Sequence, residues 1–479
     1  MEFIAPDFAP AMPEIVLSLG ICLVLLADLF IPQKHRIATL FLALATLTLT
    51  AWFVGGPGGS TGTIYSFSGS YIVDPLARIL KSFSLLIVAI VFVYSHAYLR
   101  ERNLFKGEYY LLGLFATLGI LVMISAHSLI TVYLGLELMS LALYAMVAFD
   151  RESPVAAESA MKYFVLGAIA SGVLLYGMSI LYGLTGTLII GDINSSLAAQ
   201  PSQTPALLLA IGFVTAGIAF KFGAVPFHNW VPDVYQGART SVTLFIATAP
   251  KLAAFAMLVR LMLTGLESQA EVWQPLLMVL ALLSLILGNV IAIAQTNLKR
   301  MLAYSTIAHV GFILIGFAAG SIAGRQAALF YAIVYSIMAA GAFAMVIMLS
   351  RKDFESEDLD DLKGLNQRSP WFAAMMLLLM VSMIGIPPFI GFFAKLNVLS
   401  ALVAVDQFFV AVIGVLFSVV GAFYYLRVIR LMYFDTATDQ AAIEAGLDVR
   451  FLLSINALAM LLLGVFADPL MKLCAAAIT

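Results

Sequence analysis

The sequence predicts an all-α integral membrane protein with about fourteen transmembrane helices. Of its 479 residues, 62% are hydrophobic and 11% are charged, an apolar share well above that of soluble domains. Apolar windows of about 20 residues, the length that crosses a bilayer core, recur from one end of the chain to the other. Lys and Arg fall mainly in one alternate set of the loops between these windows, which is typical of membrane proteins with a fixed orientation.

The predicted spans follow one another without room for a soluble domain between them. They are expected to begin near Pro13, Ile37, Pro75, Tyr110, Leu129, Ser159, Pro205, Thr240, Trp273, Met301, Gln326, Trp371, Phe408 and Phe451. We divide the chain into four parts. Residues 1–108 hold three N-terminal helices, 109–268 hold spans four to eight, 269–435 hold spans nine to thirteen, and 436–479 hold the last helix.

The charge distribution predicts orientation and excludes some partners. The loops rich in Lys and Arg are expected to face the cytoplasm, so that both termini lie on the non-cytoplasmic side. The net charge is -2 and no basic tract is present. Nucleic acid is therefore excluded as a partner, because phosphate binding needs a concentrated positive surface. Cys22 and Cys474 lie in apolar windows at opposite ends of the chain, which indicates neither a disulfide framework nor a thiolate metal site.

Two predicted spans are overlong and contain the same internal motif. Residues 205–235 include Gly223-Ala-Val-Pro-Phe227, and residues 371–403 include Gly385-Ile-Pro-Pro-Phe389. Proline removes a backbone donor and clashes with the preceding turn, so each span is expected to be two half-helices with an unwound middle. These are spans seven and twelve, five apart, which predicts two inverted five-helix repeats, spans four to eight and nine to thirteen. Two unrelated kinked helices are the alternative.

Five ionisable side chains are predicted near the middle of spans: Glu137, Lys221, Lys251, His309 and Lys395. Each costs at least about 2.5 kcal/mol to place there, which indicates a function. Making or breaking a contact between a carboxylate and a lysine can switch the lysine between keeping and releasing its proton, and a histidine can relay protons through its two nitrogens. We therefore predict proton transfer through these five groups, with water entering at the two breaks. A buried ion pair that only joins helices is the alternative for each of them.

Three further residues are candidates for a proton entrance. Lys162 lies a few residues into span six and is either an interfacial anchor or the entry partner of Glu137. His228 and Asp233 follow the first break and either form the entrance or fix the loop. Arg260, near the end of span eight, is expected to extend to the surface and has no predicted role.

Three stretches of the chain resemble motifs of a known family. They are Lys221-Phe-Gly-Ala-Val-Pro-Phe-His-Asn-Trp-Val-Pro-Asp-Val-Tyr235, Asn297-Leu-Lys-Arg-Met-Leu-Ala-Tyr-Ser-Thr-Ile-Ala-His309 and Gly385-Ile-Pro-Pro-Phe-Ile-Gly-Phe-Phe-Ala-Lys395. They look like motifs of the antiporter-like subunits of respiratory complex I, the NADH-quinone oxidoreductase, and the resemblance spans almost the whole chain. A lysine at the position of Lys395 is similar to subunits N and L, and the long lateral helix of subunit L is missing. The resemblance is therefore to the subunit N branch.

The resemblance implies roles for individual residues. Glu137 and Lys221 would form a modulating ion pair, Lys251 would be the linking lysine, and Lys395 would be the exit lysine. The chain also departs from the family, which usually follows the Tyr235 position with Glu-Gly-Ala-Pro-Thr. Here the run is Gln236-Gly-Ala-Arg-Thr240, which changes the expected geometry of the cytoplasmic entrance and not that of the central residues.

The resemblance further implies a proton-translocating subunit in the bacterial plasma membrane, driven by electron transfer from NADH to quinone elsewhere in the complex. NADH, FMN, iron–sulfur clusters and quinone are expected in partner subunits, which include other antiporter-like subunits and small transmembrane subunits. For this chain we expect no cofactor and no metal, because it has no Gly-rich nucleotide motif after a strand and no cysteine set for a cluster.

Two other functions compete with this interpretation. A subunit of a multi-subunit sodium or potassium/proton antiporter would share the architecture. Lysines in place of a carboxylate cluster argue against direct binding of a metal cation, which prefers oxygen ligands. A purely structural membrane scaffold is the third possibility, and it would tolerate substitution of the central residues.

Overall fold

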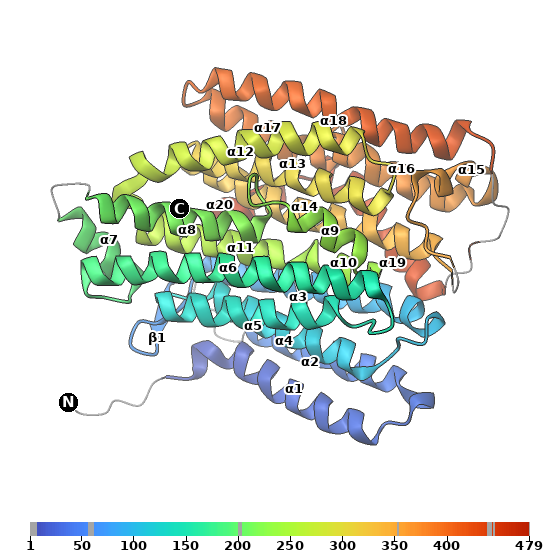
Figure 1. Cartoon of the computed structure of the whole chain (residues 1–479), viewed down its shortest axis with the longest axis horizontal. Helices are drawn as coiled ribbons and strands as arrows, with labels where there is room; N and C mark the ends of the chain where they lie inside the picture. The colour runs from blue at the N-terminus through green and yellow to red at the C-terminus, as the bar shows by residue number, and fades with distance from the viewer. Residues whose placement is uncertain are drawn as a thin grey trace.

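The computed structural model describes residues 7–55, 62–199, 204–351, 354–437, 443 and 446–478, and most of them are helical. Eleven helices run through the bundle in one piece: α1 (Met12–Phe30), α2 (Ile37–Gly55), α3 (Pro75–Glu101), α4 (Gly107–Ile124), α5 (Leu129–Val147), α6 (Pro154–Thr185), α12 (Ala270–Ile293), α13 (Leu298–Ala318), α14 (Ile322–Leu349), α18 (Phe408–Phe434) and α19 (Leu447–Val465). They lie roughly parallel to one another in a single elongated bundle (Figure 1).

Three further spans are interrupted. They consist of α8 (Pro205–Phe222) with α9 (Trp230–Gly237), of α10 (Thr240–Ile246) with α11 (Ala249–Leu258) and the π-helical η3 (Val259–Gly265), and of α16 (Pro370–Ile384) with α17 (Ile390–Val403). In the described residues, 13 helical segments are long and apolar enough to cross a membrane, and the shorter α16 and α17 together form one more crossing. The predicted all-α fold with about fourteen spans is confirmed.

Short elements connect the spans. A two-stranded antiparallel hairpin pairs β1 (Ile64–Ser66) with β2 (Tyr71–Val73), with Ile64 opposite Val73. The remaining elements are η1 (Ala9–Ala11), η2 (Gln33–His35), α7 (Ile190–Ala198), η4 (Glu267–Gln269), η5 (Leu359–Leu362), α15 (Leu365–Arg368) and α20 (Asp468–Ala477). The hairpin was not predicted, because three-residue strands are too short to produce an alternating pattern.

Local sequence explains where many of the spans begin. A Ser, Thr, Asp or Asn side chain accepts a hydrogen bond from a backbone N–H of the first turn at six helix starts. These residues are Asp74, Ser128, Ser153, Thr204, Asn297 and Ser321. In α3, α6 and α8, a proline follows in the first helical turn, where its missing N–H is not needed.

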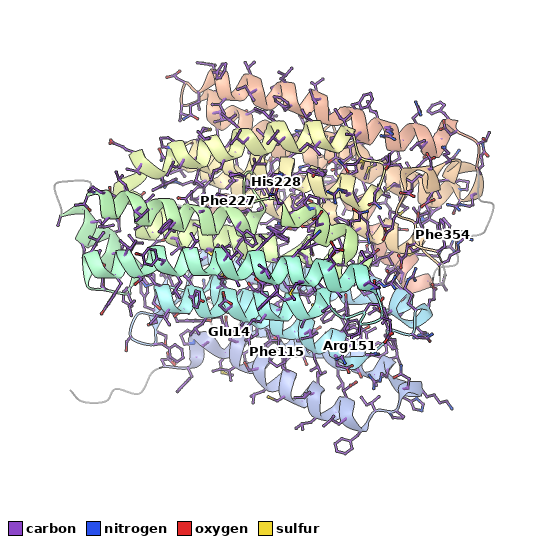
Figure 2. All side chains as sticks on the ribbon, in the orientation of Figure 1. Glu14, Phe115, Arg151, Phe227, His228 and Phe354 are labelled. Carbon is purple, nitrogen blue, oxygen red and sulfur yellow. The ribbon has the colours of Figure 1, made fainter. Side chains whose placement is uncertain are left out.

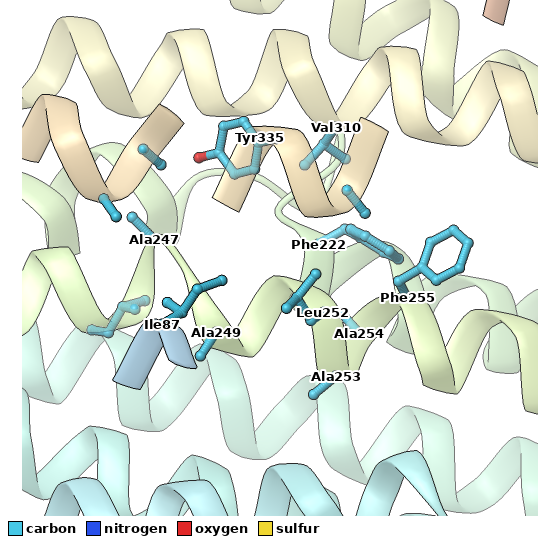
Figure 3. Close-up of a cluster of buried hydrophobic side chains, with 14 of the residues drawn as sticks. Ile87, Phe222, Ala247, Ala249, Leu252, Ala253, Ala254, Phe255, Val310 and Tyr335 are labelled. Atoms are coloured by element: carbon cyan, nitrogen blue, oxygen red, sulfur yellow. The ribbon is translucent and has the colours of Figure 1, made fainter. Parts of the chain in front are cut away.

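The core of the bundle consists of the eighth, tenth and eleventh spans. The most apolar windows of the segments 240–265 and 298–318 are completely buried, whereas only 28% of the corresponding windows in α1 and α18 is buried. Figure 3 shows the alanine-rich α11 lying among Ile87 of α3, Phe222 of α8 and Tyr335 of α14. Small side chains let helix backbones approach closely, which is how membrane helices pack without a hydrophobic driving force. Lys251 and His309 therefore lie on the most enclosed helices of the molecule.

Both predicted breaks are present. α8 ends at Phe222, Gly223 follows with φ 74°, and α9 starts only at Trp230. α16 ends at Ile384, Gly385 follows with φ 85°, and α17 starts at Ile390. Glycine takes this left-handed conformation without a Cβ penalty, so it ends each half-helix before the proline. Each break also contains one cis X–Pro bond, Val225–Pro226 or Pro387–Pro388.

A third interruption was not predicted. Span eight is helical to Ile246 and helical again from Ala249, and Thr248 between them has φ -116° and ψ -97°. Pro250 lies in the first turn of α11, where it cannot donate a backbone hydrogen bond. The result places Lys251 at the start of a helix segment instead of within a continuous one.

The expectation that Arg260 extends to the surface is wrong. Arg260 is 3% exposed, and its Nη1 and Nη2 donate to the two carboxylate oxygens of Asp74 at 2.6 and 2.8 Å. It also donates to the carbonyl of Ile124. The sequence did not indicate this pair, because Asp74 is far from Arg260 along the chain. The packing of α3 against α11 brings the two residues together.

Candidate functional site

Lys221 lies in the last turn of α8 and reaches towards α5. It is buried, and its Nζ donates a hydrogen bond to Ser140 Oγ at 2.8 Å. Glu137 lies three residues before Ser140 on the same face of α5, is partly buried, and has an Oε1 atom without a hydrogen-bond partner among the described residues. The two charges interact electrostatically, but within the described chain they do not form an ion pair. Lys221 is thus bound to the neutral neighbour of its predicted carboxylate partner.

Lys251 lies beside the first break. Its Nζ donates to the carbonyl of Phe222 at 2.8 Å and lies 5.4 Å from the ring centroid of Trp230. Trp230 is itself held by a hydrogen bond from its Nε1 to the carbonyl of Phe220 at 3.0 Å. Phe222 directly follows Lys221 in the chain, so Lys251 binds the same helix end that carries Lys221.

Lys395 has an equivalent position at the second break. Its Nζ donates to the carbonyl of Ile384 at 2.8 Å and to Ser418 Oγ at 2.9 Å. The ring centroid of Phe312 lies 5.4 Å from the same atom. Lys395 is on α17, Ser418 on α18 and Phe312 on α13, so three spans meet at this ammonium group.

Lys251 and Lys395 therefore share one electrostatic arrangement. Phe222 is the last residue of α8 and Ile384 is the last residue of α16. The last carbonyls of a helix have no partner within the helix and carry the negative end of its dipole. Each break exposes such a carbonyl inside the bundle, and in both cases a buried lysine binds it.

His309 connects three helices through tyrosine hydroxyls. Its Nδ1 is 2.8 Å from Tyr331 Oη on α14, and its Nε2 is 3.1 Å from Tyr425 Oη on α18. Tyr425 Oη in turn lies 2.6 Å from Ser305 Oγ. A cavity of about 10 Å³ is lined by both His309 and Lys395, which is close to the smallest space that holds one water molecule.

The central residues therefore form two clusters. The first cluster contains Glu137, Ser140, Lys221 and Lys251, around the end of α8. The second cluster contains His309, Tyr331, Tyr425, Ser418 and Lys395, around the end of α16. Within the part of the chain that the structure describes, no side-chain hydrogen bond joins Lys251 to His309. The predicted row of five groups is thus brought together in two parts.

Of the three predicted entrance residues, two lie together and one lies apart. Lys162 Nζ lies 3.1 Å from Asp233 Oδ2, and Arg300 Nη1 lies 2.8 Å from Asp233 Oδ1. Lys162 is exposed and also pairs with Glu158 at 2.9 Å, so it does not reach Glu137. His228 lies apart from this group, midway along the bundle beside Phe227 (Figure 2), with its ring near that of Tyr304. Asp233 and Lys162 come together, and His228 does not join them.

The departure from the family pattern creates its own contacts. Arg239 Nε donates to Asp150 Oδ2 at 2.7 Å, and Arg239 Nη1 lies 3.0 Å from Glu355 Oε1. Gln236 Oε1 accepts a hydrogen bond from Arg300 Nη1 at 3.1 Å. These bonds join the end of α5, the α9–α10 connection and the loop after α14, all at the end of the bundle where Asp233 lies.

Sequence reasoning missed Tyr331, Tyr425 and Ser418. Each lies within a long apolar span, where tyrosine and serine carry little cost and attract no notice. A weak signal was available, because Ser418 and Tyr425 are seven residues apart, two turns of one helix, and face the same cavity. Among the described residues, no group of three His, Cys, Asp or Glu side chains could hold a metal ion.

Known proteins share this fold and sequence. Residues 126–421 match the family model for NADH:quinone oxidoreductase/Mrp antiporter transmembrane regions. The chain is 54% identical over 481 residues to NADH-quinone oxidoreductase subunit N of Thioalkalivibrio sulfidiphilus, covering 100% of each chain. It is 55% identical over 472 residues to that subunit of Thiobacillus denitrificans, covering 98% of each.

Solved structures extend the comparison. A chain of respiratory complex I from Thermus thermophilus with bound aureothin matches with a TM-score of 0.82 at 29% identity, over 97% of this chain and 100% of that one. A chain of the Mrp complex from a Dietzia species matches with a TM-score of 0.82 at 21% identity, over 98% and 97%, which shows the fold alone.

Fold and site together define a multi-pass membrane subunit of the antiporter-like class, in which buried lysines lie at the ends of two broken helices. The sequence identity to the relatives then shows which family within this class the chain belongs to. The chain belongs to the NADH-quinone oxidoreductase subunit N family, as the resemblance of its three motifs predicted.

Proposed function

We propose that this chain moves protons across the membrane as a subunit of respiratory complex I, through the two buried clusters. The relatives are named as subunits of NADH-quinone oxidoreductase, so electron transfer from NADH to quinone in partner subunits would supply the energy. Other membrane subunits of that complex would be the partners. Moving one charge against the membrane potential requires about 2.3 kcal/mol per 100 mV.

One observation carries the proposal. Lys251 and Lys395 each bind the last carbonyl of a half-helix, in the buried interior of a membrane protein. A helix used only as scaffold has no reason to stop in the membrane and expose carbonyls there, since each unsatisfied group costs several kcal/mol. Unwound backbone with an ionisable side chain is the arrangement that ion-translocating membrane proteins use at their binding sites.

In the first cluster, we infer that Lys221 alternates between two partners on α5. Bound to Ser140, as in this structure, the ammonium group has a neutral partner and can release its proton. Bound to Glu137, the ammonium form is held by an opposite charge. A change in the position of Glu137 relative to Lys221 would therefore load or unload the proton, and partner subunits next to α5 could drive that change.

In the second cluster, His309 and Lys395 line one small cavity. A single water molecule there would bridge the Lys395 ammonium group and the hydroxyl of Tyr425, which also lines the cavity and lies 3.1 Å from His309 Nε2, because a water can connect two polar groups that are too far apart for a direct hydrogen bond. Tyr331 and Tyr425 fix the imidazole ring through both of its nitrogens. We propose that protons pass from the first cluster by water to His309 and then to Lys395.

The orientation and the repeats belong to the same proposal. The end of the bundle that carries Asp233, Arg239 and Glu355 would face the cytoplasm, in agreement with the loops rich in Lys and Arg. Both termini would lie on the opposite side, and the Asp233–Lys162 group would form the proton entrance. Spans four to eight and nine to thirteen would be inverted repeats, each with a lysine-bound helix end.

The test uses Lys221→Ala and Lys395→Ala in the assembled complex, reconstituted in vesicles. Proton pumping per NADH oxidised should fall in both variants, while the amount of assembled complex stays at the level of wild type. Lys34→Ala removes an exposed charge and should change neither quantity. Full pumping in both cluster variants would reject the proposal. Sodium-dependent transport without NADH oxidation would favour the antiporter instead.

A further inference from the structure

A groove between α4 and α5 lies outside both clusters. Its volume is about 530 Å³. Leu112 and Phe115 of α4 form one wall, and Ala145 of α5 with the following Ala148 forms the other. The two alanines are exposed, so the groove opens on the outer surface of the bundle. Its walls are apolar along their length.

The mouth of the groove is basic. Lys106 and Arg151 line it, both are exposed, and neither side chain has a hydrogen bond or ion pair within the described part of the chain. Glu108 also lines the mouth. Arg36 Nη1 lies 3.8 Å from its Oε2 and 3.6 Å from Asp28 Oδ2, so this arginine is shared between the two carboxylates. The mouth therefore offers two unpaired cations.

The groove has the length of a lipid leaflet. Phe115 lies nine residues after Lys106, which corresponds to roughly 13 Å along a helix at about 1.5 Å per residue. Half of a bilayer core is about 15 Å thick. Figure 2 shows the same order, with Phe115 nearer the middle of the bundle and Arg151 nearer the end that carries Phe354.

We propose that this groove binds an anionic phospholipid, with its phosphate between Lys106 and Arg151 and an acyl chain along Leu112, Phe115 and Ala145. Two cations exceed the charge of one phosphodiester, which favours a lipid with net negative charge over a zwitterionic lipid that carries its own ammonium group. Basic sites at the end of membrane helices bind anionic headgroups in this way. Free phosphate would leave the apolar walls empty, so the bound species is a whole lipid.

The test is photo-cross-linking in the assembled complex, reconstituted with phosphatidylglycerol that carries a diazirine on one acyl chain. Cross-linked peptides should map to residues 111–115 or 145–149, and unlabelled phosphatidylglycerol should compete better than phosphatidylcholine. Lys106→Gln with Arg151→Gln should weaken competition by about 30-fold. Each basic residue near an anionic headgroup contributes about 1 kcal/mol, and about 2 kcal/mol corresponds to roughly that factor in affinity. Inorganic phosphate should not compete.

Two variants separate the parts of the site. Ala145→Phe fills the groove without changing charge and should also abolish the cross-link, which keeps the test valid if the charge variant assembles poorly. Arg430→Gln removes an exposed basic residue of α18, far from the groove, and should leave the cross-link unchanged. Equal competition by both lipids, unchanged cross-linking in the charge variant, or coverage of the groove by a neighbouring subunit would overturn the proposal.

Discussion

At the scale of single residues, the proposed proton transfer depends on which partner Lys221 binds, and not only on the presence of a lysine at this position. Ser140 and Glu137 lie on one face of α5, and Lys221 Nζ binds the serine at 2.8 Å. Because charges are weakly screened in a protein interior, a buried ammonium group gains much from any acceptor and loses much without one. The hydroxyl of Ser140 and the carboxylate of Glu137 thus compete to accept a hydrogen bond from the Lys221 ammonium group.

Removing that hydroxyl should bias the competition. In Ser140→Ala, Lys221 loses its neutral acceptor, and the Glu137 contact becomes the favoured one. A hydrogen bond to a charged group contributes about 1.5 kcal/mol or more, so proton pumping in the reconstituted complex should fall by about tenfold. Ser140→Thr keeps the hydroxyl and should retain most of the activity. Ser171→Ala removes a buried hydroxyl that has no hydrogen-bond partner among the described residues and should have no effect; equal loss in this control would refute the argument.

At the scale of elements, the two helix ends depend on glycine. Gly385 has φ 85°, and a Cβ at this position would lie 2.9 Å from Lys395 Cδ. Two features therefore exclude a side chain at position 385. One is the left-handed backbone that ends α16, and the other is the lysine that lies beside the last carbonyl of that helix. The glycine that ends the helix is thus also required for the position of Lys395.

Gly385→Ala tests this constraint. A left-handed conformation costs an L-residue roughly 1–2 kcal/mol, and the added methyl group would push Lys395 away from the Ile384 carbonyl. We expect slower proton pumping with nearly normal amounts of complex, measured as acidification of vesicles during NADH oxidation. Gly212→Ala is the matched control, because a Cβ at Gly212 would meet no atom of the described residues within 4 Å. Unaltered pumping in Gly385→Ala would show that the helix end does not position the lysine.

At the scale of the whole molecule, one ion pair attaches the three N-terminal helices to a later span, and a second joins two of these helices to each other. Arg260 of the eighth span binds Asp74 at the start of α3. Lys81 of α3 binds Glu14 of α1 at 2.6 Å, and Tyr71 Oη donates to the same carboxylate at 2.6 Å. These contacts join segments that are separated by up to 186 positions in the sequence.

Breaking the longest of these contacts should destabilise the chain. Arg260→Met leaves the partly buried Asp74 carboxylate without its cation, and the loss should approach the cost of breaking a fully buried pair, about 3–5 kcal/mol. Denaturant unfolding in detergent should detect this loss. Asp74→Asn combined with Arg260→Met removes both charges and should recover part of the stability. A double variant as unstable as Arg260→Met would mean that the packing of Arg260, and not its charge, is important.

The same pair predicts a dependence on pH. Burial raises the pKa of Asp74, but the hydrogen bonds and the charge of Arg260 lower it more, so the folded-state pKa lies below the ordinary value. Asp74 therefore contributes its full stability above the unfolded-state pKa of about 3.9, and the contribution is lost as the pH falls through the folded-state value. Unfolding measured from pH 7 down to pH 3 should show a smaller acid loss in Asp74→Asn than in wild type.

Local features of the sequence predicted much of this molecule. The spans could be counted because each needs its own run of apolar residues, and the two main breaks were found because Gly and Pro act on their own backbone. An ionisable residue within a long apolar run is easy to recognise from the sequence alone. This is how the five central residues were found: Glu137, Lys221, Lys251, His309 and Lys395. The break before Lys251 was missed, because a single proline ten residues into a span is also compatible with a kinked but continuous helix.

Only the tertiary structure decided which groups meet. The partners of Lys221, Lys251 and Lys395 are two serines and two backbone carbonyls on other helices, and neither kind of group is distinctive in a sequence. Arg260 found Asp74, and His309 found two tyrosines, through contacts between helices far apart in the chain. Hydropathy and backbone preference are properties of neighbouring residues, whereas the partner of a buried charge depends on how whole helices pack, and this is why the sequence determined the spans and the packing determined the site.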